Sequence, residues 1–189
     1  MKTLFTLVLS CCFSVILFSN ALAKDIEKGA IEIGGGLDIS MSSTDTEANS
    51  TVSTDTQTID ITSLYFLQNN IGLGINWLYE NSETKSGGTT SEIKTNIIGP
   101  IVKGNFSLNE NVSAYLEGGV GVVFMESGSV NADGFAWAVE TGVSYFITKT
   151  VALNAGVHYQ SSKVETDNTN IDIDIDGMSF GIGISVFTK

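Results

Sequence analysis

The acidic segment at residues 172–177 reads Asp-Ile-Asp-Ile-Asp-Gly, and its residue types point to metal chemistry. Alternate aspartates before a glycine open the calcium loop of an EF-hand, where carboxylate oxygens bind the ion. Such a loop also needs a bidentate glutamate at its twelfth position, which here is Gly183. Because the intervening isoleucines alternate as in a strand, we expect a β-strand with one acidic face, with a weak divalent-cation site as the alternative.

His158 is the chain's only histidine and a natural candidate for a general base. Successive side chains of a strand point to opposite faces, so a serine two residues from the histidine would share its face and one three residues away would not. The residue two positions later is Gln160, and Ser161 falls on the opposite face. We therefore expect no catalytic site, and we expect His158 to be a polar residue of the interior.

Several charged residues lie on the more polar face of otherwise apolar, strand-like segments: Glu32, Asp38, Glu80, Lys103, Glu117 and Glu140. Charges enclosed by strands must be paired or hydrated, because a lone buried charge is costly. We predict a structural network of ion pairs formed by Lys103, Glu117, Glu140 and Glu32. Lys103 should pair directly with Glu117, because both are nearly equidistant from a tight turn at 109–110. The alternative role for these charges is to line a narrow or gated pore.

The segments that must position these charges alternate apolar and polar residues from residue 29 onward. Alternation over about ten residues is typical of a membrane strand with lipid on one face and a polar interior on the other. No stretch after residue 23 approaches the ~18 apolar residues of a membrane-spanning helix. We predict an all-β fold, an eight-stranded antiparallel up-and-down transmembrane β-barrel. Its strands are expected at 29–41, 58–67, 71–80, 92–108, 111–125, 134–147, 151–162 and 171–187.

The connections between these segments alternate in length. Tight turns are expected at 68–70, 109–110 and 148–150, and longer polar loops at 42–57, 81–91, 126–133 and 163–170. Outer-membrane barrels have short periplasmic turns and long outer loops, whereas a soluble β-sandwich, the alternative fold, has no reason to sort its loops in this way.

Aromatic residues also favour the barrel, because their rings prefer the two membrane interfaces. One set lies beside the short turns (Phe66, Phe106, Phe146 and Phe187) and the other toward the long loops (Trp77, Tyr79, Phe124, Trp137 and Tyr159). We expect these sets to form two girdles, with some of the rings placed on the lumen face by parity.

The last expected strand changes phase in its middle. The isoleucines of 171–175 are in phase with one another, but Met178 and the apolar residues after it are in the opposite phase. A one-residue slip moves every side chain to the other face of a sheet. We therefore expect either a β-bulge at Asp176-Gly177 or a segment that has already left the membrane.

The N-terminus predicts export. A cleaved signal peptide has a positive start, an apolar core and a cleavage site with small residues. The chain has all three, in Lys2, the apolar stretch 4–18 and Ala21-Leu22-Ala23. We expect a signal peptide at 1–23 and a barrel domain at 24–189, and the alternatives are an uncleaved anchor or a lipoprotein cleaved before Cys11 or Cys12. These are the only cysteines, so the mature chain is expected to have no thiol, disulfide or cysteine metal site.

The charge balance excludes one class of partner. The chain has 21 acidic residues, nine lysines and no arginine, and its net charge is −12. A nucleic-acid-binding protein needs a basic patch to neutralise phosphates, and this chain lacks the residues to form one. We expect no nucleic-acid partner, no cofactor and no metal site.

Four stretches carry a family resemblance: GPIVKGNF at 99–106, YLEGGVG at 115–121, GVSYF at 142–146 and FGIGISVF at 180–187. With them the chain resembles the small bacterial outer-membrane β-barrel superfamily of OmpA-like, OmpX-like and opacity-type surface proteins. The last stretch is similar to a carboxy-terminal insertion signal, although Thr188-Lys189 follow its final aromatic. The resemblance implies a barrel in the cell outer membrane of a Gram-negative bacterium. One family of eight-stranded outer-membrane enzymes, the lipid A deacylases, uses a lipid-facing His and Ser two residues apart, and His158 and Gln160 do not match that pair.

Eight strands leave an interior that side chains can fill, so a general porin is not expected. The leading hypothesis is a non-enzymatic barrel that displays polar, acidic surface loops in a structural, adhesion or surface-interaction role. The alternative is a small OmpW-like channel or transporter that carries an apolar solute through the wall, and an enzyme acting on lipid is a third.

Expected partners are outer-membrane lipid and, during biogenesis, periplasmic chaperones and the barrel-assembly machinery. The barrel itself is expected to be a monomer.

Overall fold

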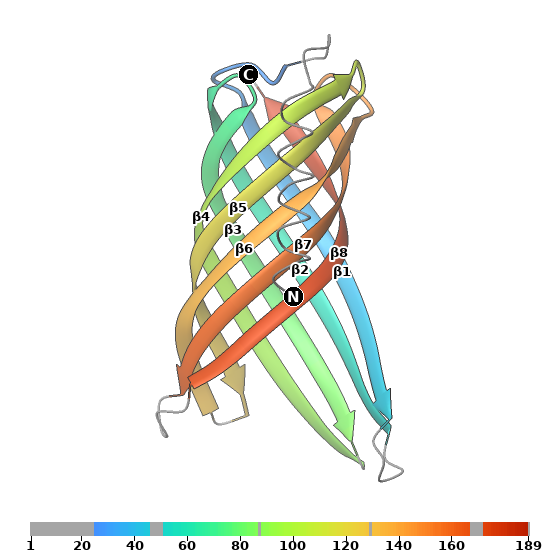
Figure 1. Cartoon of the computed structure of the whole chain (residues 1–189), viewed down its shortest axis with the longest axis vertical. Helices are drawn as coiled ribbons and strands as arrows, with labels where there is room; N and C mark the ends of the chain where they lie inside the picture. Colours follow the sequence, from blue (N-terminus) through green and yellow to red (C-terminus); the bar gives the residue numbers. More distant parts are fainter. Residues whose placement is uncertain (1–24, 46–50, 87, 129, 167–171, 189) are drawn as a thin grey trace, which may run out of the picture.

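The computed structural model describes residues 25–45, 51–86, 88–128, 130–166 and 172–188, so the expected signal peptide lies outside the described residues. Within these ranges the chain forms the strands β1 (Ile31–Asp45), β2 (Thr51–Gln68), β3 (Ile71–Ser86), β4 (Thr89–Asn109), β5 (Val112–Ser127), β6 (Val130–Phe146), β7 (Val151–Thr166) and β8 (Asp172–Thr188). Each strand pairs antiparallel with the next, and β8 pairs with β1, which closes the barrel (Figure 1). No helix in the described ranges is long and apolar enough to cross a membrane. The predicted eight-stranded up-and-down architecture is confirmed.

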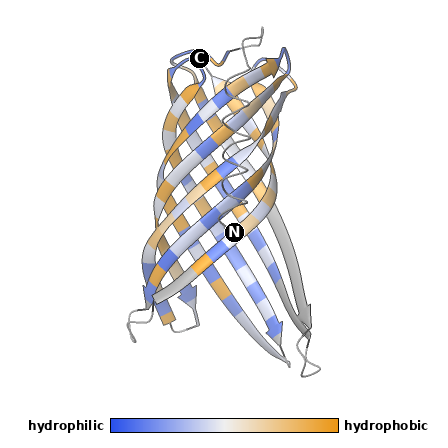
Figure 2. Ribbon diagram, in the orientation of Figure 1, coloured by the Kyte–Doolittle hydropathy of each residue, from blue (hydrophilic) through white to orange (hydrophobic). Residues whose placement is uncertain are grey.

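The alternation of residue types sets the two faces of the wall (Figure 2). On β1, Ile33 and Leu37 point outward with 55% and 61% of their surface exposed, whereas Glu32 points inward and is 1% exposed. In a bilayer the outward side chains meet lipid, and backbone groups pair with neighbouring strands in place of water. Because a one-residue slip would turn the inner charges toward lipid, the pattern itself fixes the register.

One end of the barrel, here called the terminal end, contains Ile31 and Thr188. Its connections are residues 69–70, 110–111 and 147–150, close to the predicted tight turns. Asn70 has a φ of 66°, a left-handed conformation that asparagine tolerates better than most residues. Its side-chain oxygen accepts a hydrogen bond from Ile26 N at 2.8 Å, which ties the segment before β1 to this end.

The other end, here called the hairpin end, differs from the prediction. The polar segments expected as long loops are mostly strand, since β1 runs to Asp45, β2 begins at Thr51, and only residues 87–88 separate β3 from β4. Apolar alternation stops where lipid contact stops, but backbone pairing does not depend on lipid. Threonine-rich segments favour extended backbone, and hydrated side chains on both faces let a hairpin continue in water.

Of the two options for the phase change in the last strand, the bulge at Asp176-Gly177 is wrong, and a segment that has left the membrane stays a prediction. β8 stays in regular register with β7 through Gly177, which faces Gln160. The described register shifts lie instead beside two tight turns, at residues 66–68 and 107–109. The β1–β8 ladder ends at Asp38 and Gly181, and the two strands diverge toward the hairpin end in Figure 1. The part of β8 before Gly181 therefore pairs only with β7 within the described residues.

Two apolar clusters lie in the interior. The first contains Ile26, Ala30, Leu64, Phe66, Ile101, Phe146, Ala152 and Phe187. The second contains Leu78, Ile97, Val123, Met125, Ala132, Ala136 and Val164. On β6 the first cluster contributes Phe146 and the second Ala136, and the polar residues Ser144 and Glu140 lie between them. Polar side chains therefore occupy the middle of the interior.

The predicted aromatic girdle at the terminal end is wrong for three of its members. Phe66, Phe146 and Phe187 are at most 8% exposed and belong to the first apolar cluster, with Phe187 centred 6.4 Å from Phe66 and 5.4 Å from Phe146. They stand on the inward positions of their strands, so closeness to a turn did not predict their direction. The set expected at the other interface lies on the outward positions, where Phe124, for example, is 52% exposed.

Candidate functional site

Lys103 lies on an inward position of β4 and is 4% exposed. It is level with Glu117 on β5, as the distance from the turn predicted. Its ammonium nevertheless forms its ion pair elsewhere, donating to Glu32 Oε1 at 2.6 Å. The predicted direct pair between Lys103 and Glu117 is therefore replaced by one across the interior. A small barrel is narrow enough for a long side chain from β4 to reach β1, and no numbering relation between adjacent strands reports that distance.

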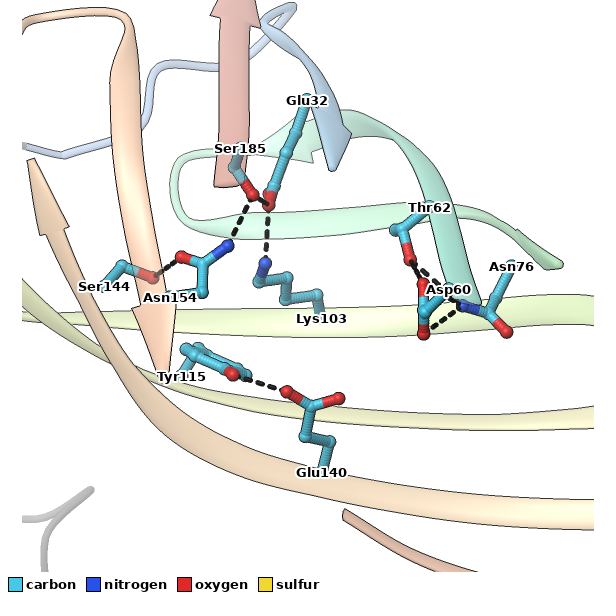
Figure 3. Close-up of polar contacts among 10 residues, drawn as sticks. All are labelled: Glu32, Asp60, Thr62, Asn76, Lys103, Tyr115, Glu140, Ser144, Asn154 and Ser185. Carbon is cyan, nitrogen blue, oxygen red and sulfur yellow. Dashed lines mark hydrogen bonds and ion pairs between the residues drawn. The ribbon is translucent and has the colours of Figure 1, made fainter. Parts of the chain in front are cut away.

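Glu32 is the centre of a chain of hydrogen bonds (Figure 3). Its Oε1 also accepts a hydrogen bond from Ser185 Oγ at 2.6 Å. Ser185 accepts from Asn154 Nδ2 at 2.7 Å, and Asn154 Oδ1 accepts from Ser144 Oγ at 2.7 Å. This chain of hydrogen bonds, which begins at the Glu32 carboxylate, joins residues of β1, β4, β6, β7 and β8. It restricts their side chains to one arrangement.

Glu140 holds a second polar group next to the first. Tyr115 donates its hydroxyl hydrogen to Glu140 Oε1, and His158 Nδ1 lies 3.7 Å from Glu140 Oε2. The ammonium of Lys103 lies 4.8 Å from the centre of the Tyr115 ring, so the tyrosine contacts both groups. His158 points into the interior, as expected from its phase, and its side chain is 17% exposed.

Asp60 forms a third group that the sequence reasoning did not select. Asn76 Nδ2 donates to both carboxylate oxygens at 3.0 Å, and Thr62 Oγ1 donates to Oδ1 at 3.1 Å. A signal was present, because Asp60 alternates with Ile59 and Ile61 and therefore belongs to the inward face. Tyr115, Asn154 and Ser185 were also missed, since uncharged polar residues on an inward face do not stand out by type.

Two cavities lie among these groups, and both are lined by Asp60, Glu117, Glu140 and His158. The first cavity extends toward β4, β5 and β6, and its wall includes Leu78, Ile97 and Gly119. The second extends toward Glu32, Lys103 and the glycines of β1 and β8. Glu117 makes no hydrogen bond or ion pair within 4 Å in the described part of the chain, although it was predicted to be the partner of Lys103.

The β4–β5 wall has a break beside the first cavity. The ladder pairs Ile98 with Val122 and resumes at Ile101 with Gly119, so Gly99 and Pro100 are skipped. Proline has no N–H to donate to a neighbouring strand. A Cβ at Gly99 would lie 1.9 Å from Val120 O, so only glycine allows the strands to approach here. The first cavity is lined by Gly99, Val120 and Gly121 at this break.

The remaining candidates do not form a site in the described residues. The side chains of Asp38, Asp172 and Asp174 lie outside the description, and Asp176 is exposed. Glu80 is half-buried on an inward position of β3. No group of three or more His, Cys, Asp and Glu side chains in the described ranges is arranged to hold a metal ion.

Comparison with known proteins identifies the barrel. Residues 9–186 match the family model described as "Outer membrane protein beta-barrel domain". No curated protein matches the chain. The crystal structure of OprG from Pseudomonas aeruginosa is 17% identical, with a TM-score of 0.61, and the alignment covers 86% of this chain and 97% of that one. The crystal structure of Neisserial surface protein A is 18% identical, with a TM-score of 0.57 and coverage of 84% and 97%. At these identities the two structures show a shared fold. The chain therefore belongs to the outer membrane protein beta-barrel domain family and is a protein of the bacterial outer membrane.

Proposed function

We propose that this non-enzymatic barrel passes a small apolar solute through its wall, between β4 and β5, and has no open axial pore. The observation that carries the proposal is the break in the ladder at Gly99 and Pro100, against which the first cavity lies. Elsewhere along this ladder paired backbone separates the interior from lipid. At the break, two residue pairs are missing between β4 and β5, and the partly apolar first cavity lies directly against this part of the wall.

The surroundings of the break suit an apolar solute. Ile98, Val102 and Val120 point outward beside it and are 44%, 52% and 46% exposed, so they belong to the lipid-facing belt. On the inner side, Leu78, Ile97 and Ile101 line the cavity. A solute that leaves here enters hydrocarbon directly, where the transfer of apolar surface out of water is favourable.

The axial direction is the less favourable route. The two apolar clusters and the Lys103–Glu32 pair lie across the axis, as side chains do in eight-stranded barrels, and the two cavities lie among them. We propose that Lys103, Glu32, Glu140 and Glu117 act together as a structural network. In planar bilayers with potassium chloride, we expect the purified protein to give no steady openings, and steady single-channel openings would contradict a closed axis.

A disulfide across the break tests the wall route. No cysteine follows residue 12, so Pro100→Cys with Val120→Cys introduces one defined pair on the outer face of β4 and β5. The probe is the nonpolar dye N-phenyl-1-naphthylamine, whose entry into cells is followed by fluorescence. We expect the oxidised variant to admit the dye no faster than cells that lack the protein, and we expect reduction to restore entry.

The matched control is Ile98→Cys with Val122→Cys, a pair that already faces each other in the ladder. Because these positions already pair in the ladder, oxidation there should leave dye entry unchanged. Unchanged entry with the disulfide at 100 and 120 fully formed would exclude passage through this part of the wall.

A surface-interaction role, in adhesion or structure, is the second candidate, and the hairpin end supports it. The polar hairpin formed by β3 and β4 carries ion pairs between Lys85 and Glu83 at 2.9 Å and between Lys94 and Glu92 at 3.5 Å. The hydrogen bond and charge of Glu83 raise the pKa of Lys85 above its ordinary value. We propose that these extended hairpins, in place of the long loops expected from sequence, are the acidic surface presented to the outside.

The surface role is tested by shortening this hairpin. Asn81 pairs with Lys94, so residues 82–93 can be replaced by Asn-Gly without disturbing the strands below. Reduced attachment of cells to glass and to epithelial monolayers, with unchanged dye entry, is the expected result. Unchanged attachment removes this hairpin from a surface role.

The closed ring also bears on the oligomeric state and on the assembly of the protein. The ladder from β1 to β8 closes the ring within one chain, so a second copy is not required to pair the strand edges at the terminal end. We propose a monomer that periplasmic chaperones deliver to the barrel-assembly machinery after removal of a signal peptide at 1–23.

A further inference from the structure

The second cavity contains more negative than positive groups. Its lining includes the carboxyl groups of Glu32, Asp60, Glu117 and Glu140, and its only lysine is Lys103. Lys103 is already engaged by Glu32 at 2.6 Å. The remaining carboxyl groups therefore face a cavity in whose lining His158 is the only other basic side chain. An enclosed excess of carboxylate favours a cationic guest.

Glu32 adds an independent sign of a ligand. Its side chain is 1% exposed, and it lines the second cavity. Oε1 accepts from Lys103 and Ser185, but Oε2 is buried with no hydrogen-bond partner in the described part of the chain. A buried carboxylate oxygen without a donor is costly, so a donor supplied by a guest is stabilising at this position. His158 Nε2, in the lining of both cavities, is buried and without a partner as well.

The chemistry favours an ammonium over a metal ion. No set of three or more ligating side chains converges in the described ranges, as a directly bound metal requires. An ammonium needs only N–H donors that can meet separate carboxylates and a ring face that attracts its charge. Lys103 demonstrates both interactions here, since its Nζ donates to Glu32 and lies 4.8 Å from the centre of the Tyr115 ring.

The neighbouring first cavity extends this chemistry to a substituted amine. It shares Asp60, Glu117, Glu140 and His158 with the second cavity, and its further lining includes Leu78, Ile97 and Ile101. A short alkyl chain attached to an ammonium can therefore lie against apolar side chains while the charged head remains among the carboxylates.

We propose that the barrel interior is a binding site for a small primary alkylammonium ion, with Glu117 and Glu32 Oε2 as acceptors for its N–H groups. Glu117 is the residue to test, because it lines both cavities and has no hydrogen bond or close ion pair of its own in the described residues. The site concerns binding and is independent of whether a solute crosses the wall.

The first experiment uses the unmodified protein folded in phosphatidylcholine vesicles. The midpoint of urea unfolding is measured in equal concentrations of n-butylammonium, tetramethylammonium and sodium chloride. We expect n-butylammonium alone to raise the midpoint, because a ligand that binds only the folded state stabilises it, and tetramethylammonium has no N–H to donate. Equal midpoints in all three salts would overturn the proposal, since general screening would explain them.

The second experiment compares Glu117→Gln with Glu83→Gln, an exposed control on β3 that pairs with Lys85. Binding of n-butylammonium is measured by isothermal titration calorimetry on protein shown to be folded by its gel mobility before boiling. We expect at least tenfold weaker binding for Glu117→Gln and unchanged binding for Glu83→Gln. Equal affinity in both variants places the ammonium outside this cavity and refutes the assignment.

Discussion

At the scale of single residues, the ion pair between Lys103 and Glu32 is the interaction with the largest expected energetic effect. Both side chains are at most 5% exposed, so removal of the lysine leaves a carboxylate buried without its partner. We predict that Lys103→Met lowers the free energy of unfolding by roughly 3–5 kcal/mol. The measurement is equilibrium urea unfolding of the protein folded into lipid vesicles.

Lys85→Met is the control for this prediction, because Lys85 also pairs with a glutamate but is 56% exposed. A solvated pair contributes about 0–1 kcal/mol, so the two methionine variants should differ clearly. A double-mutant cycle then identifies the partner, and coupling should be larger between Lys103 and Glu32 than between Lys103 and Glu117. Equal losses in the two methionine variants would show that the buried pair adds no stability.

The sequence predicted part of this site. Strand phase correctly indicated that Lys103, Glu117 and Glu140 face inward, and distance from the turn placed Lys103 level with Glu117. The partner Glu32 was not predictable in this way, because β1 and β4 face each other across the interior and are separated by two strands. Contacts through the interior depend on the diameter and tilt of the barrel, which alternation along one strand does not encode.

At the scale of elements, a glycine fixes how closely β4 and β5 approach. A Cβ at Gly99 would lie 1.9 Å from Val120 O and 2.5 Å from the Cα of Gly121, and both are backbone atoms that cannot rotate away. We predict that Gly99→Ala lowers the free energy of unfolding by roughly 1–3 kcal/mol, the range for overpacking. Urea unfolding in vesicles provides the measurement.

Gly177→Ala is the matched control on β8, since nothing lies within 4 Å of a Cβ at that position. Its effect should stay within about 0.5 kcal/mol, as for surface substitutions. If Gly99→Ala is tolerated as well as Gly177→Ala, the close approach of the two strands does not constrain the wall.

The elements themselves were predictable where lipid acts on them. Alternation located the apolar part of each strand because lipid outside and polar groups inside impose opposite demands on successive residues. It failed at the hairpin end, where Thr51 begins β2 well before the predicted start at residue 58. At Gly177 the change of phase allowed either a bulge or a segment outside the membrane, and the regular register with β7 excludes the bulge; this part of β8 is not flanked by β1.

At the scale of the whole molecule, closure of the ring predicts resistance to detergent. Every strand from β1 to β8 has two neighbours at the terminal end, so no edge is open there to begin unfolding. We predict that the folded protein keeps its barrel in sodium dodecyl sulfate until it is boiled, and that it therefore migrates differently before and after boiling. Identical mobility of the two samples, both taken from protein folded in detergent micelles, argues against a closed barrel.

The pairing of Ile31 with Thr188 also limits when, during synthesis and export, the barrel can close. The residue that begins the ring waits for a partner in β8, the strand that closes it, so a nascent chain that ends before β8 has no closed form. A chain interrupted before β8 retains two open edges and is a substrate for proteases and aggregation. The cell must therefore export and shield all eight strands before β1 has both of its neighbours, and the speed of synthesis and export sets how long the open chain is exposed to proteases.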